Sequence, residues 1–406
     1  MRTRTWCVAA ALFCLPRLAV AQIVLSEADA LARLSDDSPQ VRAIKAVVEV
    51  ARAEALAAAR WPNPRFTYNR EAVAGVTENM FLIAQALPIT GRREFDISAA
   101  SARVNASQLR GDEEIRQARA ALRAAYADLV AAQSRETEMT ASRDRLGGLA
   151  EILARREAAG EAAGYDRLRA EREVTDLEAD LAAARADRSR AQASLAGFFS
   201  LSTDVGSLVA SDQAPSRTPL PTVDEMLARA QTTLPALAAL NQDLASADFA
   251  MKAAERRPIP EPEVVAGTKS SNAAGGDVGS VFSVHVALPL FDRAKPEQAV
   301  AQARRAEAEA RIAALHASLR AQVTGLRAIV TERRQAADGY RASTATNANQ
   351  LERIAQLSYD AGERGILELL DAYRNGSAAR LRQASLDVAT RQAEIELELV
   401  SGWEIR

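Results

Sequence analysis

The charged residues with the most suggestive spacing lie in residues 357–371, LSYDAGERGILELLD. Glu368 and Asp371 are three positions apart, so on a helix both carboxylates lie on one face. Such acids attract cations, and Arg364 is near enough in sequence to pair with carboxylates of this kind. The alternative is that all three are ordinary solvated charges, each worth under about 1 kcal/mol.

The same stretch is expected to be a bend between two long helices. Gly362 and Gly365 interrupt a chain that otherwise reads as helix from 297 to 359 and again to about 400. Each glycine costs about 1 kcal/mol relative to alanine inside a helix. A matching bend is expected at residues 157–167, EAAGEAAGYDR. The sequence therefore predicts two long helical hairpins whose bends hold the functional residues.

Other reactive residues are scarce. The chain has no phosphate loop and no nucleophile motif, so we expect neither an enzyme nor a cofactor. His285 lies in an expected strand and His316 in an expected helix, and we interpret both as polar or packing residues rather than metal ligands. The only cysteines are Cys7 and Cys14, both near the N-terminus.

Residues 1–21 have the pattern of a secretory signal peptide. A basic start is followed by an apolar run at 6–15 and an Ala-x-Ala site at 19–21. The alternatives are a membrane anchor or a soluble N-terminal helix. Cleavage would remove both cysteines and three arginines, which changes the formal net charge from −2 to −5 and gives no reason to expect a nucleic-acid partner. No later run reaches 18 apolar residues, so a transmembrane helix is not expected.

The rest of the chain shows the same order of elements two times, namely helix, β-hairpin and long helical hairpin. Five short matches recur in the same order with offsets of 196 to 202, including Ala-Leu-Pro at 86–88 and 287–289. The fold is therefore expected to be mainly α with a small β part, in two tandem repeats. The expected boundaries are a first repeat at 22–200 (strands about 65–74 and 79–88, helical hairpin about 92–197), a linker at 201–221, and a second repeat at 222–406 (strands about 263–271 and 280–290, helical hairpin about 296–402).

The return helix of the first hairpin has a coiled-coil seam. Its positions alternate at spacings of four and three, and only Arg188 is charged. The seam residues are Ala170, Val174, Leu177, Leu181, Ala184, Arg188, Ala191 and Leu195.

The last expected strand alternates in a way that suits a membrane barrel. Phe282, Val284, Val286 and Leu288 fall on one face, whereas Ser283 and His285 fall on the other. Four strands cannot close a barrel, because open edges are not tolerated in lipid, but three chains would supply twelve. The alternative is a soluble sheet packed on the helices.

With these features the chain resembles the outer-membrane efflux proteins, the exit ducts of tripartite pumps and type I secretion systems. It is most similar to the heavy-metal branch, the cobalt–zinc–cadmium resistance ducts, on the strength of residues 85–93, QALPITGRR, and 288–293, LPLFDR. The resemblance implies a homotrimer with a twelve-stranded outer-membrane β-barrel, continued by a periplasmic α-helical barrel. It implies outer-membrane lipid, a periplasmic adaptor and an inner-membrane proton-driven pump as partners, in a Gram-negative bacterium.

The resemblance also assigns roles to the two bends. Tyr359, Arg364, Glu368 and Asp371 match the family's periplasmic gate, in which acidic rings face the tunnel and arginine pairs across protomers. The small residues at the bends match the tips that receive the adaptor's hairpin. These tip residues are Ala159, Gly160, Glu161, Ala361, Gly362 and Glu363.

The cargo implied by the resemblance is a heavy-metal cation, and a passive tunnel needs no metal ligands because tight binding would slow exit. Two alternatives stay open. One is a drug-efflux or type I secretion duct of the same fold, and the other is a periplasmic adaptor or structural coiled-coil protein.

Overall fold

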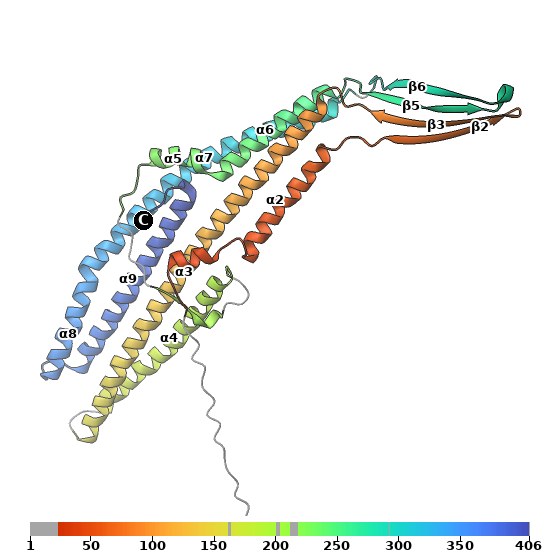
Figure 1. Ribbon diagram of the computed structural model, residues 1–406. Coiled ribbons are helices and arrows are strands. Elements are labelled where there is room, and N and C mark those ends of the chain that lie inside the picture. The colour runs from red at the N-terminus through yellow and green to blue at the C-terminus, as the bar shows by residue number, and fades with distance from the viewer. Residues whose placement is uncertain (1–22, 161–163, 200–203, 212–217, 292, 406) are drawn as a thin grey trace, which may run out of the picture.

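The computed structural model describes residues 23–160, 164–199, 204–211, 218–291 and 293–405. The fold is elongated, with a small sheet at one end and two helical hairpins at the other (Figure 1). The prediction of a mainly α fold with a small β part is confirmed. The expected signal peptide lies outside the described residues. Among those that are described, no helix is both long and apolar enough to cross a membrane.

The two repeats follow each other in the chain. The first contains α1 (Glu27–Arg33), α2 (Pro39–Ala58), β2 (Arg65–Val73), β3 (Val76–Ala86), α3 (Arg92–Ala158) and α4 (Gly164–Ala196). The second contains α5 (Val223–Thr233), α6 (Pro235–Arg256), β5 (Pro262–Ser271), β6 (Asp277–Val286), α7 (Lys295–Tyr340), α8 (Thr346–Asp360) and α9 (Ile366–Ser401).

Each repeat starts with the same local device. Ser26 Oγ accepts a hydrogen bond from Asp29 N at 3.1 Å, and the Asp29 carboxylate accepts one from Ser26 N. Thr222 and Glu225, 196 positions later, form the same reciprocal pair. Each pair satisfies backbone donors that the first turn of a helix leaves free. The capping hydrogen bonds from Ser26 and Thr222 lower the pKa of Asp29 and of Glu225.

The described part of the segment between the repeats contains a short strand. Residues 208–210 form β4 (Leu208–Ala210), which pairs in parallel with β1 (Ile23–Leu25) at the start of the described chain. The buried Tyr126 of α3 donates its hydroxyl to the Leu25 carbonyl oxygen at 2.9 Å. This small sheet therefore fixes the first described residues and part of the segment between the repeats on the middle of α3.

Two other predicted elements end or break at different residues. The strand β6 stops at Val286, so Leu288 lies beyond it in the following connection. The helix expected to run unbroken through residues 297–359 is interrupted by a π-helical segment, η3 (Arg341–Ala345), between α7 and α8. Such segments insert an extra residue into a turn and often occur where a helix must be redirected.

The larger sheet joins the two repeats. Its strand order is β2-β3-β5-β6, and every pairing is antiparallel. The central pair, β3 and β5, brings Leu82 of the first repeat opposite Gly267 of the second. A Cβ at position 267 would overlap the Phe81 carbonyl oxygen, so only glycine permits this approach.

Replacing Gly267 by alanine is therefore expected to destabilise the joint between the repeats by about 1–3 kcal/mol, the usual cost of overpacking. The measurement is thermal unfolding of the purified protein in detergent, followed by circular dichroism. The matched control is Gly279→Ala on β6, where an added Cβ meets nothing within 4 Å. Equal melting temperatures for the two variants would contradict the expected strain.

Charged side chains also tie the repeats together, beside the middle of α3 and near the C-terminal ends of α7 and α9. Arg123 of α3 pairs with Glu27 of α1 and with Glu398 of α9. Arg391 bridges Glu27 and Glu394, at 2.9 and 3.4 Å. Arg334 of α7 closes the chain of contacts on Glu394 at 2.7 Å. We call these six residues the mid-helix network.

Candidate functional site

The second bend reverses the chain through two glycines. Gly362 has a φ of +72°, a left-handed conformation that glycine adopts without strain. The backbone nitrogen of Glu363 donates to the Ser358 carbonyl oxygen at 2.9 Å, which closes the end of α8. Gly365 then precedes the first residue of α9. The glycines that mark the bend in the sequence thus end one helix and start the next.

Three of the four predicted gate residues lie together. Arg364, Glu368 and Asp371 line one groove of about 540 Å³ between α8 and α9, and all three are exposed. Asn375 donates to Asp371 at 2.9 Å. Within the described residues of a single chain, Arg364 forms no ion pair with either acid. The groove therefore offers two carboxylates and one guanidinium to whatever lies beside it.

Tyr359, the fourth predicted gate residue, does not line this groove. The ring of Tyr359 is half-buried, and the Arg156 guanidinium of α3 lies over it, 5.6 Å from the ring centre. A buried apolar cluster continues this contact above the bends, with Leu153 and Ala170 from the first hairpin and Ile366 and Leu369 from the second. In this structure Tyr359 joins the two hairpins of one chain.

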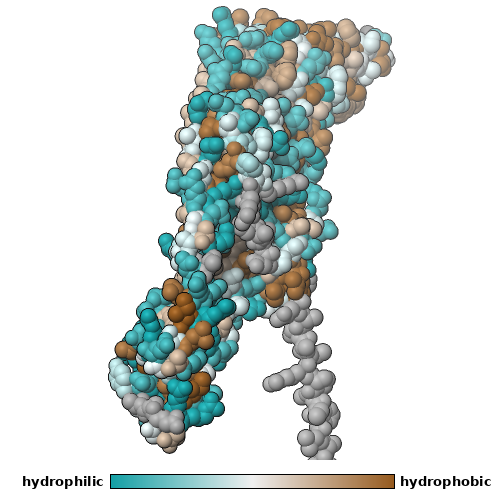
Figure 2. All heavy atoms as spheres, turned by 90° about the vertical axis from the view of Figure 1, so that its left-hand side faces the viewer, coloured by the Kyte–Doolittle hydropathy of each residue, from teal (hydrophilic) through white to brown (hydrophobic). Residues whose placement is uncertain are grey.

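The first bend has a similar backbone. Gly160 has a φ of +76°, and its nitrogen donates to the Glu157 carbonyl oxygen at 2.9 Å. Ala159, Gly160, Ala361, Gly362 and Glu363 are all exposed, whereas Glu161 lies outside the described residues. In Figure 2 apolar atoms interrupt the hydrophilic surface of the lower arm, where both hairpins end. The two tips thus present small residues on an exposed surface.

A ring of four charges holds the hairpins together above the tips, and it was not predicted from the sequence. Arg145 contacts Glu138 at 3.1 Å and Glu352 at 3.7 Å. Arg380 contacts the same two carboxylates, at 2.8 and 2.9 Å. Burial disfavours the charge on Arg380, but its hydrogen bonds to Glu352 and Glu138 outweigh burial and raise its pKa. We call Glu138, Arg145, Glu352 and Arg380 the hairpin ring.

The hairpin ring depends on a glycine and two serines. A Cβ at Gly376 would overlap the Glu352 carboxylate, so the glycine leaves room for that side chain. Beside it, the buried Ser142 hydroxyl of α3 donates to Ser377 Oγ of α9 at 2.9 Å. The spacing of Glu138 and Arg145, two helical turns apart on α3, is the one sequence signal that points to this site.

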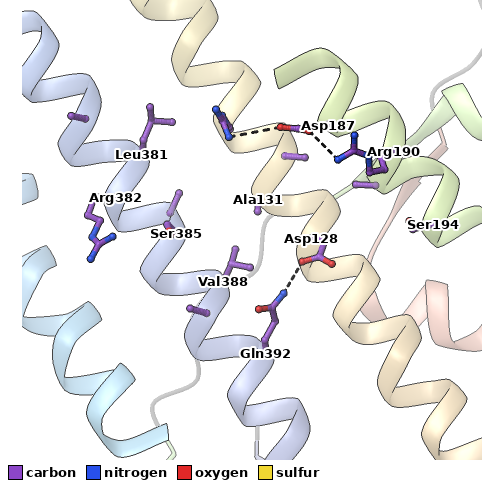
Figure 3. Close-up of a pocket in the computed structure, with 16 residues that line it drawn as sticks. Asp128, Ala131, Asp187, Arg190, Ser194, Leu381, Arg382, Ser385, Val388 and Gln392 are labelled. Carbon is purple, nitrogen blue, oxygen red and sulfur yellow. Dashed lines mark hydrogen bonds and ion pairs between the residues drawn. The ribbon is translucent and has the colours of Figure 1, made fainter. Parts of the chain in front are cut away.

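A larger cavity of about 870 Å³ lies between α3, α4 and α9 (Figure 3). Its polar groups already contact one another: Gln392 donates to Asp128 at 2.7 Å, and Asp187 lies 3.6 Å from Arg190. Burial raises the pKa of Asp128, and the Gln392 hydrogen bond opposes this. The lining provides no group of side chains suited to nucleophilic or acid–base catalysis.

The histidines remain apart from one another. His285 lies on the edge strand β6, 3.9 Å from Glu263, and His316 is exposed on α7. Over the parts of the chain that the structure covers, no three His, Cys, Asp or Glu residues are placed to hold a metal ion.

Solved structures share this fold. A membrane protein from Pseudomonas aeruginosa matches with a TM-score of 0.78 and 20% identity, over 93% of each chain. The outer-membrane channel OprN matches at 0.73 and 18%, over 93% of this chain and 89% of its own. CusC, described in connection with transmembrane channel formation, matches at 0.75 and 15%, over 93% and 92%. No protein-family model matches the sequence, and no curated protein matches it.

Proposed function

We propose that this protein is the outer-membrane channel of a tripartite efflux system. The main support is the arrangement of the molecule: a four-stranded sheet with an exposed apolar face lies at one end, and two long helical hairpins lie at the other. The match to channel structures covers nearly the whole chain. The sheet would sit in the outer membrane, and the hairpins would extend into the periplasm.

The proposed channel is a homotrimer. In the half of the molecule next to the sheet, the helices form a layer in the order α2-α3-α6-α7, so α2 and α7 are its free edges there (Figure 1). Both edges expose large apolar side chains, including Val47 and Leu56 on α2 and Val300 on α7. Exposed apolar edges of this kind favour association with further copies. Three four-stranded sheets would give a barrel of twelve strands.

The proposed gate is the groove at the second bend. In a trimer, three copies of Glu368 and Asp371 would form acidic rings at the end of the tunnel, and these rings would favour cations. Arg364, which has no acidic partner among the described residues of its own chain, would pair with acids of a neighbouring protomer and hold the tunnel closed. The exposed tips would receive the hairpin of a periplasmic adaptor, since glycine allows close backbone approach.

The first test of this function is membrane fractionation. We expect the mature protein in the outer membrane as a detergent-requiring trimer that dissociates on heating in SDS. The periplasmic adaptor alternative predicts a protein without a barrel, and a water-soluble monomer would overturn the channel proposal. The near-complete match to channel folds favours the channel over the adaptor.

The proposed cargo is a heavy-metal cation delivered by a proton-driven inner-membrane pump. The acids of the groove support this choice, because rings of carboxylates concentrate cations. We expect a deletion strain to become more sensitive to zinc, cobalt, cadmium or copper, and complementation with the wild-type gene to restore resistance. Sensitivity to drugs alone would instead favour a drug duct of the same fold.

A further inference from the structure

The two outer strands of the larger sheet each leave one backbone edge unpaired. β2 and β6 lie at the ends of the order β2-β3-β5-β6, and no other described strand pairs with their free sides. β2 and β6 run antiparallel to each other, because three antiparallel pairings separate them. The free edge of β6 in one chain therefore has the right direction to pair with the free edge of β2 in another.

The internal duplication relates the strands by fixed offsets. Ala86 ends β3 just before Leu-Pro, and Ala287 holds the same place 201 positions later. The same backbone hydrogen bond follows each strand: Ile89 N donates to the Leu87 carbonyl oxygen, and Leu290 N donates to the Leu288 carbonyl oxygen, both at 2.9 Å. Ala84 of β3 pairs with Arg65 of β2, and His285, the equivalent of Ala84 in β6, pairs with Glu263 of β5. Arg65 and Glu263 are therefore equivalent, so β2 corresponds to β5 with an offset of 198.

The pairing of β3 with β5 is then the internal equivalent of a contact between β6 and the β2 of a second copy. The internal register pairs Ile83 with Ala266 and Ala84 with Val265. Adding the β3-to-β6 offset of 201 to Ala84 gives His285. Subtracting the β2-to-β5 offset of 198 from Val265 gives Thr67 of the neighbouring chain. We propose that β6 pairs with the neighbour's β2 in this register, with His285 opposite Thr67, Val284 opposite Tyr68 and Val286 opposite Phe66. This inference rests on the proposed trimer.

The register keeps the apolar face of the sheet continuous. Phe66 and Tyr68 of β2 pair with Ile83 and Phe81 of β3, and Val284 of β6 falls on the same face through the β5 pairings. All five are exposed in the single chain. The proposed pairing places Val284 and Val286 beside the neighbour's Tyr68 and Phe66 on that face. A slip of one residue would turn this row to the other side of the sheet.

Thr90 and Phe291 are equivalent under the offset of 201 that relates β3 to β6. Inside the chain, Thr90 is buried, and its carbonyl oxygen accepts a hydrogen bond from Arg256 of α6 at 3.2 Å. Phe291 is 98% exposed in the single chain. Because α2 takes the place of α6 at the contact between chains, the end of the neighbour's α2 would cover Phe291 in the proposed pairing.

Disulfide cross-linking tests the register. The only cysteines, Cys7 and Cys14, lie in the expected signal peptide, so the processed chain offers a cysteine-free background. Leu87 donates to the Pro262 carbonyl oxygen, so Leu87 and Pro262 form a hydrogen-bonded pair, and hydrogen-bonded and non-hydrogen-bonded pairs alternate along the strands. Ala84 and Val265, three positions along, are therefore a non-hydrogen-bonded pair. The Cα atoms of a non-hydrogen-bonded pair are about 4.5 Å apart, within the range that a disulfide spans. The double variant Thr67→Cys, His285→Cys is therefore the probe.

We expect oxidation of this variant to give covalent dimers and trimers on non-reducing gels. The matched controls, His285→Cys with Arg65→Cys or with Asn69→Cys, place the second thiol two residues away on the same face. Their Cα atoms would be about 7–8 Å apart, and we expect at least about tenfold less cross-linking. Native mass measurement of each variant in detergent establishes whether trimers form.

The outcomes separate the two proposals. Trimers that cross-link best through a control pair would overturn the register and leave the channel proposal standing. An oxidised Thr67→Cys, His285→Cys protein that stays at monomer mass would also overturn the register. A protein that never forms trimers would overturn the channel proposal, and the register with it.

Discussion

Replacing Glu368 and Asp371 together by alanine is expected to raise the single-channel conductance of the proposed trimer, reconstituted in lipid, and to reduce its preference for cations. Both acids line the groove at the second bend, beside Arg364. If each exposed ion pair to a neighbouring Arg364 contributes about 0.5 kcal/mol, three copies contribute about 1.5 kcal/mol. Their loss would shift the balance between closed and open channels by roughly tenfold. Arg364→Ala should give the same rise in conductance.

The control for this experiment is Glu363→Ala. Glu363 is exposed at the same bend, but it does not line the groove. The Glu363→Ala substitution removes one charge per chain close to the end of the proposed tunnel, so this control tests whether net charge alone changes the conductance. Conductance is measured in planar bilayers, and cation preference comes from the reversal potential in a salt gradient. If the Glu368→Ala, Asp371→Ala double variant and Arg364→Ala both conduct like the wild type, the constriction of the proposed channel lies elsewhere.

Any opening of the proposed gate must also involve the contacts that hold the second hairpin on the first. Tyr359 packs beneath Arg156, and Glu352 and Arg380 of the hairpin ring lie about three to four helical turns from the bend. Opening therefore either breaks the hairpin ring or moves both hairpins of a protomer together. The buried hydrogen bond between Ser142 and Ser377 favours the second possibility, because separating the two would remove the Ser142 partner of the Ser377 hydroxyl, whereas Ser142 keeps Glu138 of its own helix.

The bends and strands could be predicted because their signals are local. Gly160 and Gly362 both adopt the left-handed conformation that ends a helix, and alternation marked the strands. The coiled-coil seam was visible for the same reason, and Leu181, Ala184 and Leu195 are buried along it. Even Arg188, the charged residue in the seam, is accommodated locally, since it donates to Glu136 at 3.0 Å.

The missed contacts join residues that are far apart in the chain. Arg156 meets Tyr359 across 203 positions, and nothing near either residue in the sequence indicates the other. The same holds for Glu352 and Arg145, whose pairing depends on how two hairpins pack. The pairing of β4 with β1 was hidden because three-residue strands carry almost no alternation. Local patterns thus located the bends but not the side chains that hold them together.

The mid-helix network shows how much such long-range contacts can matter. Glu394 is only 1% exposed, and it pairs with Arg334 of α7 and Arg391 of α9. Removing one partner of a buried ion pair leaves the opposite charge without compensation in a poorly solvated place. Here two arginines would lose the same carboxylate. Their remaining contacts, to the Thr218 carbonyl oxygen and to Glu27, cannot neutralise both charges.

Glu394→Ala is therefore expected to cost about 3–5 kcal/mol in the free energy of unfolding, the usual penalty for breaking a buried ion pair from one side. The matched control is Glu396→Ala, two residues along the same helix, where the side chain is exposed and the expected change is within about 0.5 kcal/mol. The comparison is made by thermal and urea unfolding of the purified proteins in detergent. If the two variants unfold alike, packing of the apolar clusters rather than the mid-helix network holds the repeats together.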